Sequence, residues 1–186
     1  MIGLKRGTVE LVPYQEDWQR SAMEVMSELK EILGNTAIAI QHIGSTAIRS
    51  IHAKPIIDIA VGVEKLEDIQ PYIPTLEQHD FIYRGQDVAG QILFVLTGIE
   101  KDIRTHYIHI VEWKGTAWNN YINFRDYLNT FEEKAALYDR CKQSLAAQFP
   151  TDRGKYTAGK QKLIDQLLKE ASFWKAQSVS NPDQDK

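Results

Sequence analysis

Cysteine is nearly absent from the 186-residue sequence, and a single residue of this type, Cys141, excludes an internal disulfide. No apolar run is long enough to span a membrane, and the first residues, MIGLKRGTVELVPY, lack the apolar segment of a signal peptide. The formal net charge is −3, so the broad positive surface of many nucleic-acid-binding proteins is not expected. These absences predict a cytoplasmic protein that enters no membrane and binds no nucleic acid.

The composition is that of a globular protein, with 43% hydrophobic and 25% charged residues. A chain of this length can bury a core without disulfides or metals. Neither a repeat nor a linker is visible, so we expect one domain over residues 1–176. Residues 177–186 are polar and are expected to form a flexible tail.

The first half of the chain alternates between helix-type and strand-type patterns. A helix is expected after Pro13, with apolar residues recurring every three or four positions from Trp18 to Leu33. A second, short helix is expected at 65–78, broken by its prolines. The strand-type segments are 36–43, 55–63, 81–85, 91–98 and 105–113.

The second half is expected to be helical. One helix spans 117–128, another begins at a capping box formed by Thr130 and Glu133, and the last covers 155–175. A mixed sheet followed by helices predicts an α+β domain, in which a mixed β-sheet packs against helices and the C-terminal half is helical.

Each of the last three helices carries one cation on its apolar stripe: Arg125, Lys142 and Lys160. Long side chains can bury their stems and still reach water, which is one explanation. The other is that the three side chains bind an anion, because removing a cation from water costs free energy unless an anion pairs with it. Phosphate or carboxylate groups of a ligand would provide that charge. An internal network with Asp58 and no ligand is the third interpretation.

The segment HIGSTAIRSIHAKPIIDIAVGV carries a second signal. Gly44, Ser45 and Thr46 form a turn whose N–H and hydroxyl groups can bind an anion, although Gly-Ser-Thr turns are also common as plain turns. Asp58 interrupts an apolar strand and has only small neighbours on its face. It is expected either to be neutralised by Lys54 or to face a pocket as a base or metal ligand.

Four segments together resemble the GrpB-like family: HIGSTAIRSIHAKPIIDIAVGV, HYIHIVEWKGTAWNNYINFRDYL, YDRCKQSLAAQFP and YTAGKQKLI. They occur in the family's order, and the resemblance runs from about Val9 to Ala171. It implies the nucleotidyltransferase-type fold of polymerase-β-like enzymes. In that superfamily a Gly-Ser turn, here Gly44-Ser45, lies against nucleotide phosphates. The strand aspartate, here Asp58, holds a divalent metal, so Mg²⁺ or Mn²⁺ is implied.

The resemblance also shows a reduced set of carboxylates. Ala60 stands where a second aspartate is required, and the later strand offers His106 and His109 instead of a third carboxylate. Imidazole favours softer metals than magnesium, so His42, Asp58 and His109 could instead gather around a zinc-like ion. The family also occurs fused to dephospho-CoA kinases, where it resembles a folding accessory.

Two functions therefore remain open. The first is a nucleotidyl or phosphoryl transferase acting on a small phosphate-bearing molecule, nucleotide or CoA-type. In it Asp58 and His109 act in catalysis, and the turn binds the phosphate together with Lys54, Arg125, Lys142 and Lys160. The second is a non-catalytic domain that binds an anion or stabilises a protein partner.

Overall fold

The computed structural model describes residues 2–180 and contains a six-stranded mixed sheet. The strand order is β2-β3-β6-β5-β4, and β1 pairs with β6. The central strands β3 and β6 are parallel, while the other pairs are antiparallel. The strands are β1 (Leu4–Lys5), β2 (Ala39–Ile43), β3 (Ile57–Val63), β4 (Ile82–Val88), β5 (Gln91–Thr97) and β6 (Ile103–Glu112).

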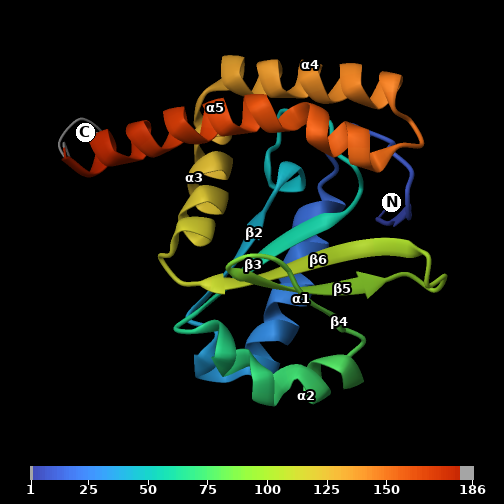
Figure 1. Ribbon diagram of the computed structural model, residues 1–186, viewed down its shortest axis with the longest axis vertical. Coiled ribbons are helices and arrows are strands. Elements are labelled where there is room, and N and C mark those ends of the chain that lie inside the picture. Colours follow the sequence, from blue (N-terminus) through green and yellow to red (C-terminus); the bar gives the residue numbers. More distant parts are fainter. Residues whose placement is uncertain (1, 181–186) are drawn as a thin grey trace.

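The C-terminal helices gather on one side of the sheet, and α2 lies on the opposite side (Figure 1). Helices α4 and α5 run next to each other and both contact α3. The helices are α1 (Asp17–Leu33), α2 (Ile73–Gln78), α3 (Thr116–Thr130), α4 (Glu132–Gln148) and α5 (Arg153–Ser180), with short 3-10 turns η1 (Gly34–Thr36), η2 (Ser45–Ala47) and η3 (Leu66–Tyr72). No helix within residues 2–180 is long and apolar enough to cross a membrane.

This arrangement confirms the predicted α+β class, and each expected strand and helix is present with shifted ends. The capping box was wrong. Thr130 belongs to α3, where its hydroxyl donates a hydrogen bond to the carbonyl of Asp126, and α4 begins at Glu132 without a side-chain cap. Helix α5 continues to Ser180, past the expected boundary at 176, and the remainder of the expected tail lies outside the described residues.

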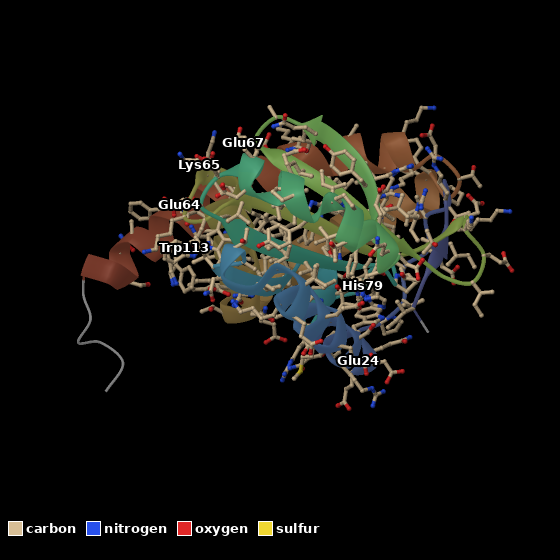
Figure 2. The ribbon with its side chains drawn as sticks, turned by 90° about the horizontal axis from the view of Figure 1, so that it is seen from below. Glu24, Glu64, Lys65, Glu67, His79 and Trp113 are labelled. Carbon is tan, nitrogen blue, oxygen red and sulfur yellow. The ribbon has the colours of Figure 1, made fainter. Side chains whose placement is uncertain are left out.

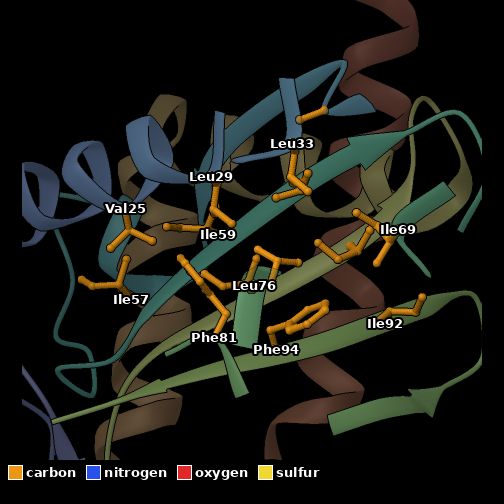
Figure 3. Close-up of a cluster of buried hydrophobic side chains, with 14 of the residues drawn as sticks. Val25, Leu29, Leu33, Ile57, Ile59, Ile69, Leu76, Phe81, Ile92 and Phe94 are labelled. Atoms are coloured by element: carbon orange, nitrogen blue, oxygen red, sulfur yellow. The ribbon is translucent and has the colours of Figure 1, made fainter. Parts of the chain in front are cut away.

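One face of the sheet is filled by apolar side chains. Ile57, Ile59, Val61 and Val63 of β3 alternate toward this face and are fully buried. Helix α1 covers them with residues such as Leu29, and η3 and α2 close the core from the other end (Figure 3). Burying these branched side chains stabilises the sheet by roughly 1.5–3 kcal/mol each.

The other face of β3 carries Asp58, Ala60 and Gly62. Gly62 leaves room for Trp113 and for Trp118 of α3, since a Cβ there would lie 2.9 Å from the first indole and 3.0 Å from the second. Beyond the carboxyl end of β3 the side chains of Glu64 and Lys65 are exposed, as Figure 2 shows. The one carboxylate of β3, Asp58, lies near its amino end and has 31% of its side-chain surface exposed.

Candidate functional site

The Gly-Ser-Thr turn lies directly against the strand aspartate. Strand β2 ends at Ile43, which is paired in register with Asp58, and the chain turns at Gly44 with φ 71°. A Cβ on Gly44 would lie 2.5 Å from Asp58 Oδ2. Glycine is required here for two reasons: it tolerates the left-handed backbone, and it leaves space for the carboxylate.

Beside this contact is a pocket of about 210 Å³. It lies between the turn, the segment before β3, strand β6 and the two C-terminal helices. Four cations line it, and Asp58 is the one carboxylate among its lining residues. The lining residues are Ser45, Lys54, Ile56, Asp58, Tyr107, Lys142, Arg153, Tyr156, Thr157 and Lys160.

Burial and mutual repulsion perturb the lysines of this pocket. Burial, with a smaller contribution from the charges of Arg153 and Lys160, lowers the pKa of Lys54 to about 7 against the opposing effect of Asp58. Burial likewise lowers the pKa of Lys142 to about 7, although Asp139 partly offsets it. The pKa of Lys160 is lowered, again mainly by burial. The pocket thus holds more positive charge than its own walls neutralise.

Aromatic rings, rather than carboxylates, accompany most of these cations. Lys54 Nζ and Lys160 Nζ lie 5.3 and 4.8 Å from the centre of the Tyr156 ring. Arg153 donates a hydrogen bond of 2.8 Å to the Tyr107 hydroxyl. The ion pairs found within residues 2–180 include none for these three cations. A cation–π contact contributes only about 0.5–2 kcal/mol, so their charge remains available to an anion.

Lys142 is the most enclosed of the four, with 1% of its surface exposed. Its ammonium donates a hydrogen bond to the carbonyl of His52 and lies 3.8 Å from Asp139 Oδ1. Hydrogen bonds to Asp139 from the His52 side chain, from Gln143 and from the backbone N–H of His52 hold its pKa below the usual value despite burial. Lys142 is therefore anchored at the base of the pocket by protein groups.

Asp58 begins a chain of polar groups that leads away from the pocket. Its Oδ1 lies 3.3 Å from His109 Nε2, and His109 Nδ1 lies 3.5 Å from the Tyr121 hydroxyl. That hydroxyl donates a hydrogen bond to Gln91 Oε1. The imidazole is fixed from both sides, and the carboxylate faces the cations with 31% of its side-chain surface exposed.

Arg125 does not join the other cations. It donates hydrogen bonds to Gln41 Oε1 and to the carbonyl of His42, and it forms an ion pair with Asp126. It lines a separate pocket of about 300 Å³ between α1 and α3. The expected convergence of three helix cations therefore holds for Lys142 and Lys160 but is wrong for Arg125, whose charge β2 and Asp126 satisfy.

The turn also divides its residues between the two pockets. Ser45 lines the cationic pocket, whereas Thr46 is buried and lines the Arg125 pocket. The Thr46 hydroxyl lies 2.9 Å from His42 Nε2. Burial lowers the pKa of His42 to about 4, and Arg125 acts in the same direction against the effect of Asp58. His42 is therefore neutral near pH 7.

The residues around Asp58 do not fit a divalent metal. Within residues 2–180 no group of three acidic, histidine or cysteine side chains is placed to hold one, so His42, Asp58 and His109 are not such a set. Magnesium needs several oxygen ligands, and the pocket offers a single carboxylate surrounded by cations. The implied Mg²⁺ or Mn²⁺ therefore stays a prediction without support from the donor atoms.

His106 lies on the other face of β6 and takes no part in this site. Its Nε2 lies 3.1 Å from the Ser21 hydroxyl of α1, and burial lowers its pKa to about 4. Arg153 and Tyr156, in contrast, line the pocket and had not been predicted to do so. A signal for them exists, because Arg153, Tyr156 and Lys160 are spaced three and four residues apart on one face of α5.

The fold and the site thus define an α+β protein with a cationic pocket beside one strand aspartate. The family model described as "GrpB protein" matches residues 8–170, and the chain belongs to the GrpB family. "Glutamate-rich protein GrpB" of Alkalihalophilus pseudofirmus is 38% identical over 91% of this chain and 99% of the relative. The crystal structure of the conserved protein GrpB from Enterococcus faecalis superposes with a TM-score of 0.81, at 31% identity, over 89% of this chain and 99% of that one.

Structures of the Cid1 poly(U) polymerase are also similar, at a TM-score of 0.46 and 11% identity. The matched part is 70% of this chain and 45% of that one. A likeness at this level carries no argument about substrate or activity. The function must therefore be argued from the pocket itself.

Proposed function

We propose that this protein binds a small phosphate-bearing molecule, of nucleotide or CoA type, in the pocket between Ser45, Asp58 and helix α5. One observation carries the proposal: four cations line about 210 Å³ of space together with a single carboxylate. Three of them, Lys54, Arg153 and Lys160, form no ion pair with a carboxylate among the ion pairs of the described residues. An anionic ligand would relieve their repulsion, and phosphate oxygens suit both the lysines and the guanidinium of Arg153.

The energetic gain is sufficient for specific binding. A charge-assisted hydrogen bond contributes about 1.5–3 kcal/mol, and several can form at once in this pocket. The turn adds the hydroxyl of Ser45, which lines the pocket together with Asp58. The small volume admits the phosphate part of a ligand, while a larger organic part would extend toward solvent.

The proposal is tested by thermal unfolding with nucleotides, CoA-type compounds and sugar phosphates, each with and without magnesium. A ligand that binds only the folded state raises the melting temperature. Replacing Lys160 by glutamine should lower the affinity of the best ligand about tenfold or more, because one charge-assisted contact is lost.

Lys162→Gln is the matched control, since it makes the same change two positions away on an exposed part of α5. It should bind like the unaltered protein. If no phosphate compound raises the melting temperature, or if both variants lose affinity equally, phosphate binding in this pocket is contradicted.

A transfer reaction is a further part of the proposal. Asp58 would accept the proton of an acceptor hydroxyl as that oxygen attacks phosphorus, and the cations would neutralise the departing phosphate. His109, 3.3 Å from Asp58, would orient the carboxylate. Asp58→Asn should then abolish turnover while the bound phosphate compound is retained.

The competing function is a non-catalytic anion-binding or partner-stabilising domain. It is favoured by Ala60, which stands where a second carboxylate would be needed and is fully buried. If the protein is non-catalytic, the unaltered protein shows no turnover above background. Asp58→Asn then has no reaction rate to lower. Assays of phosphate or pyrophosphate release with the ligands found by thermal unfolding separate the two.

A further inference from the structure

We propose that the pocket binds its phosphate group as the free anion, and that Lys54, Arg153 and Lys160 serve in place of a divalent cation. This inference rests on the proposed function and defines the ionic form of its ligand. It is opposite to the expectation from the nucleotidyltransferase resemblance, in which metal ions hold the phosphates. The inference follows from the residues that occupy the positions around Asp58 where further metal ligands would be needed.

The position on β3 that would carry a second carboxylate is occupied by an alanine that packs among apolar side chains. Ala60 is fully buried in a small cluster with Ile43, Val111 and Trp118. Its partner in register on β6 is His109, whose Nε2 is directed to Asp58. A carboxylate at position 60 would enter this apolar cluster, so the strand presents one acidic group where a metal cradle needs several.

The position opposite Asp58 on β6 is occupied by a cation-binding aromatic residue. Tyr107 pairs in register with Asp58, and its hydroxyl accepts a hydrogen bond from Arg153. The guanidinium also lies 5.2 Å from the centre of the same ring. Tyr107 therefore adds no carboxylate beside Asp58, and it positions a permanent positive charge in the pocket.

The charge of the pocket favours an unchelated ligand. A magnesium ion bound to a polyphosphate cancels two of its negative charges, which reduces the attraction to the surrounding cations. The ion itself would enter a space lined by four cations and one carboxylate. The chemical class that fits is therefore a di- or polyanionic phosphate whose oxygens are free to accept hydrogen bonds from ammonium and guanidinium groups.

The test measures the affinity of the full chain for inorganic pyrophosphate by isothermal titration calorimetry, once in EDTA and once in excess magnesium. We expect binding in EDTA that is as tight as in magnesium or tighter. Binding that requires magnesium would overturn this inference and leave phosphate binding intact. Failure to bind under either condition would overturn both.

A charge variant gives a second, independent reading. Asp58→Asn should tighten pyrophosphate binding in EDTA several-fold, because it removes the one negative charge that repels the ligand. If Asp58 held a metal, the same change would instead weaken binding and make it insensitive to magnesium. The sign of the change therefore decides between the two.

Asp126→Asn is the matched control for this variant. Its side chain is exposed to nearly the same extent, 29% against 31% for Asp58, but it pairs with Arg125, which lines the other pocket. The control should leave pyrophosphate affinity unchanged. Equal tightening in both variants would show a general effect of net charge and would contradict the proposed role of the pocket. Melting temperatures of both variants establish that they are folded.

Discussion

The two faces of the central sheet are built on opposite principles, although the same strands supply both. On the face toward α1, side chains such as Ile59 and Phe94 are fully buried among apolar neighbours. On the face toward α4 and α5, the same strands place Asp58 and Tyr107 beside a pocket lined by lysines. One face therefore stabilises the fold, and the other holds like charges together at the expense of stability.

This difference locates function without reference to any relative. A buried apolar cluster needs no ligand to be stable, whereas partly buried lysines with lowered pKa values raise the free energy of the folded state. Such an arrangement is typical of a binding or catalytic site. Three measurements sharpen the contrast between the faces.

The largest effect is expected on the apolar face. Phe94→Ala should lower the free energy of unfolding by about 3–5 kcal/mol, because it leaves a cavity in a filled core. Urea denaturation measures this change. Ile99→Ala is the control, since Ile99 is fully exposed and its loss should have little effect. A loss below about 1 kcal/mol for Phe94→Ala would contradict the assignment of this face as the stabilising one.

An effect of intermediate size is expected from pH on the cationic face. The pKa of Lys54 and Lys142 is about 7 when folded and 10.5 when unfolded. Between these values the folded state binds fewer protons, so stability should rise with pH, by roughly 2 kcal/mol for each of the two lysines from pH 7 to pH 9. Urea denaturation at several pH values measures the slope.

Lys142→Met provides the control for this slope. It removes one of the two titrating groups from a site that is 1% exposed, while Asp139 keeps its bonds to His52 and Gln143. The rise in stability between pH 7 and pH 9 should become clearly smaller. An unchanged slope would mean that Lys142 titrates normally in the folded protein and that the pocket is not strained by charge.

The smallest effect concerns the contact between the turn and the carboxylate. Gly44→Ala and Gly85→Ala both place a side chain at positive φ, 71° and 80°, but only Gly44 faces a neighbour, Asp58. Gly44→Ala should therefore cost about 1 kcal/mol more than Gly85→Ala. Chemical denaturation of the pair measures the difference. Equal losses of stability in the two variants would show that a side chain at position 44 does not clash with Asp58.

Periodicity in the sequence predicts most of this architecture. Alternation along 55–63 gives the two faces of β3, and helical spacing gives the inward direction of Lys142 and Lys160. Neither pattern predicts which group a side chain will contact in the folded protein. Arg125 is directed inward as expected. Its guanidinium donates hydrogen bonds to Gln41 and to the carbonyl of His42, more than 80 residues earlier, and does not reach the cationic pocket.

Errors at element ends account for the other differences. The last helix was expected to begin at Lys155, so Arg153 fell outside it and its common face with Lys160 was not recognised. Thr130 has the sequence of a helix cap, but α3 extends to it and its hydroxyl bonds within that helix. Helix ends depend on tertiary contacts that a local pattern does not contain.

The central claim is that Lys54 and the α5 cations Arg153 and Lys160 share one anion beside Ser45. Crystals grown from ammonium sulfate test it most directly. The account predicts a sulfate between Ser45, Lys54 and Lys160, at full occupancy in the unaltered protein and lost in Lys160→Gln. An empty pocket at high sulfate concentration, or a sulfate bound only beside Arg125 and Arg49, would contradict it.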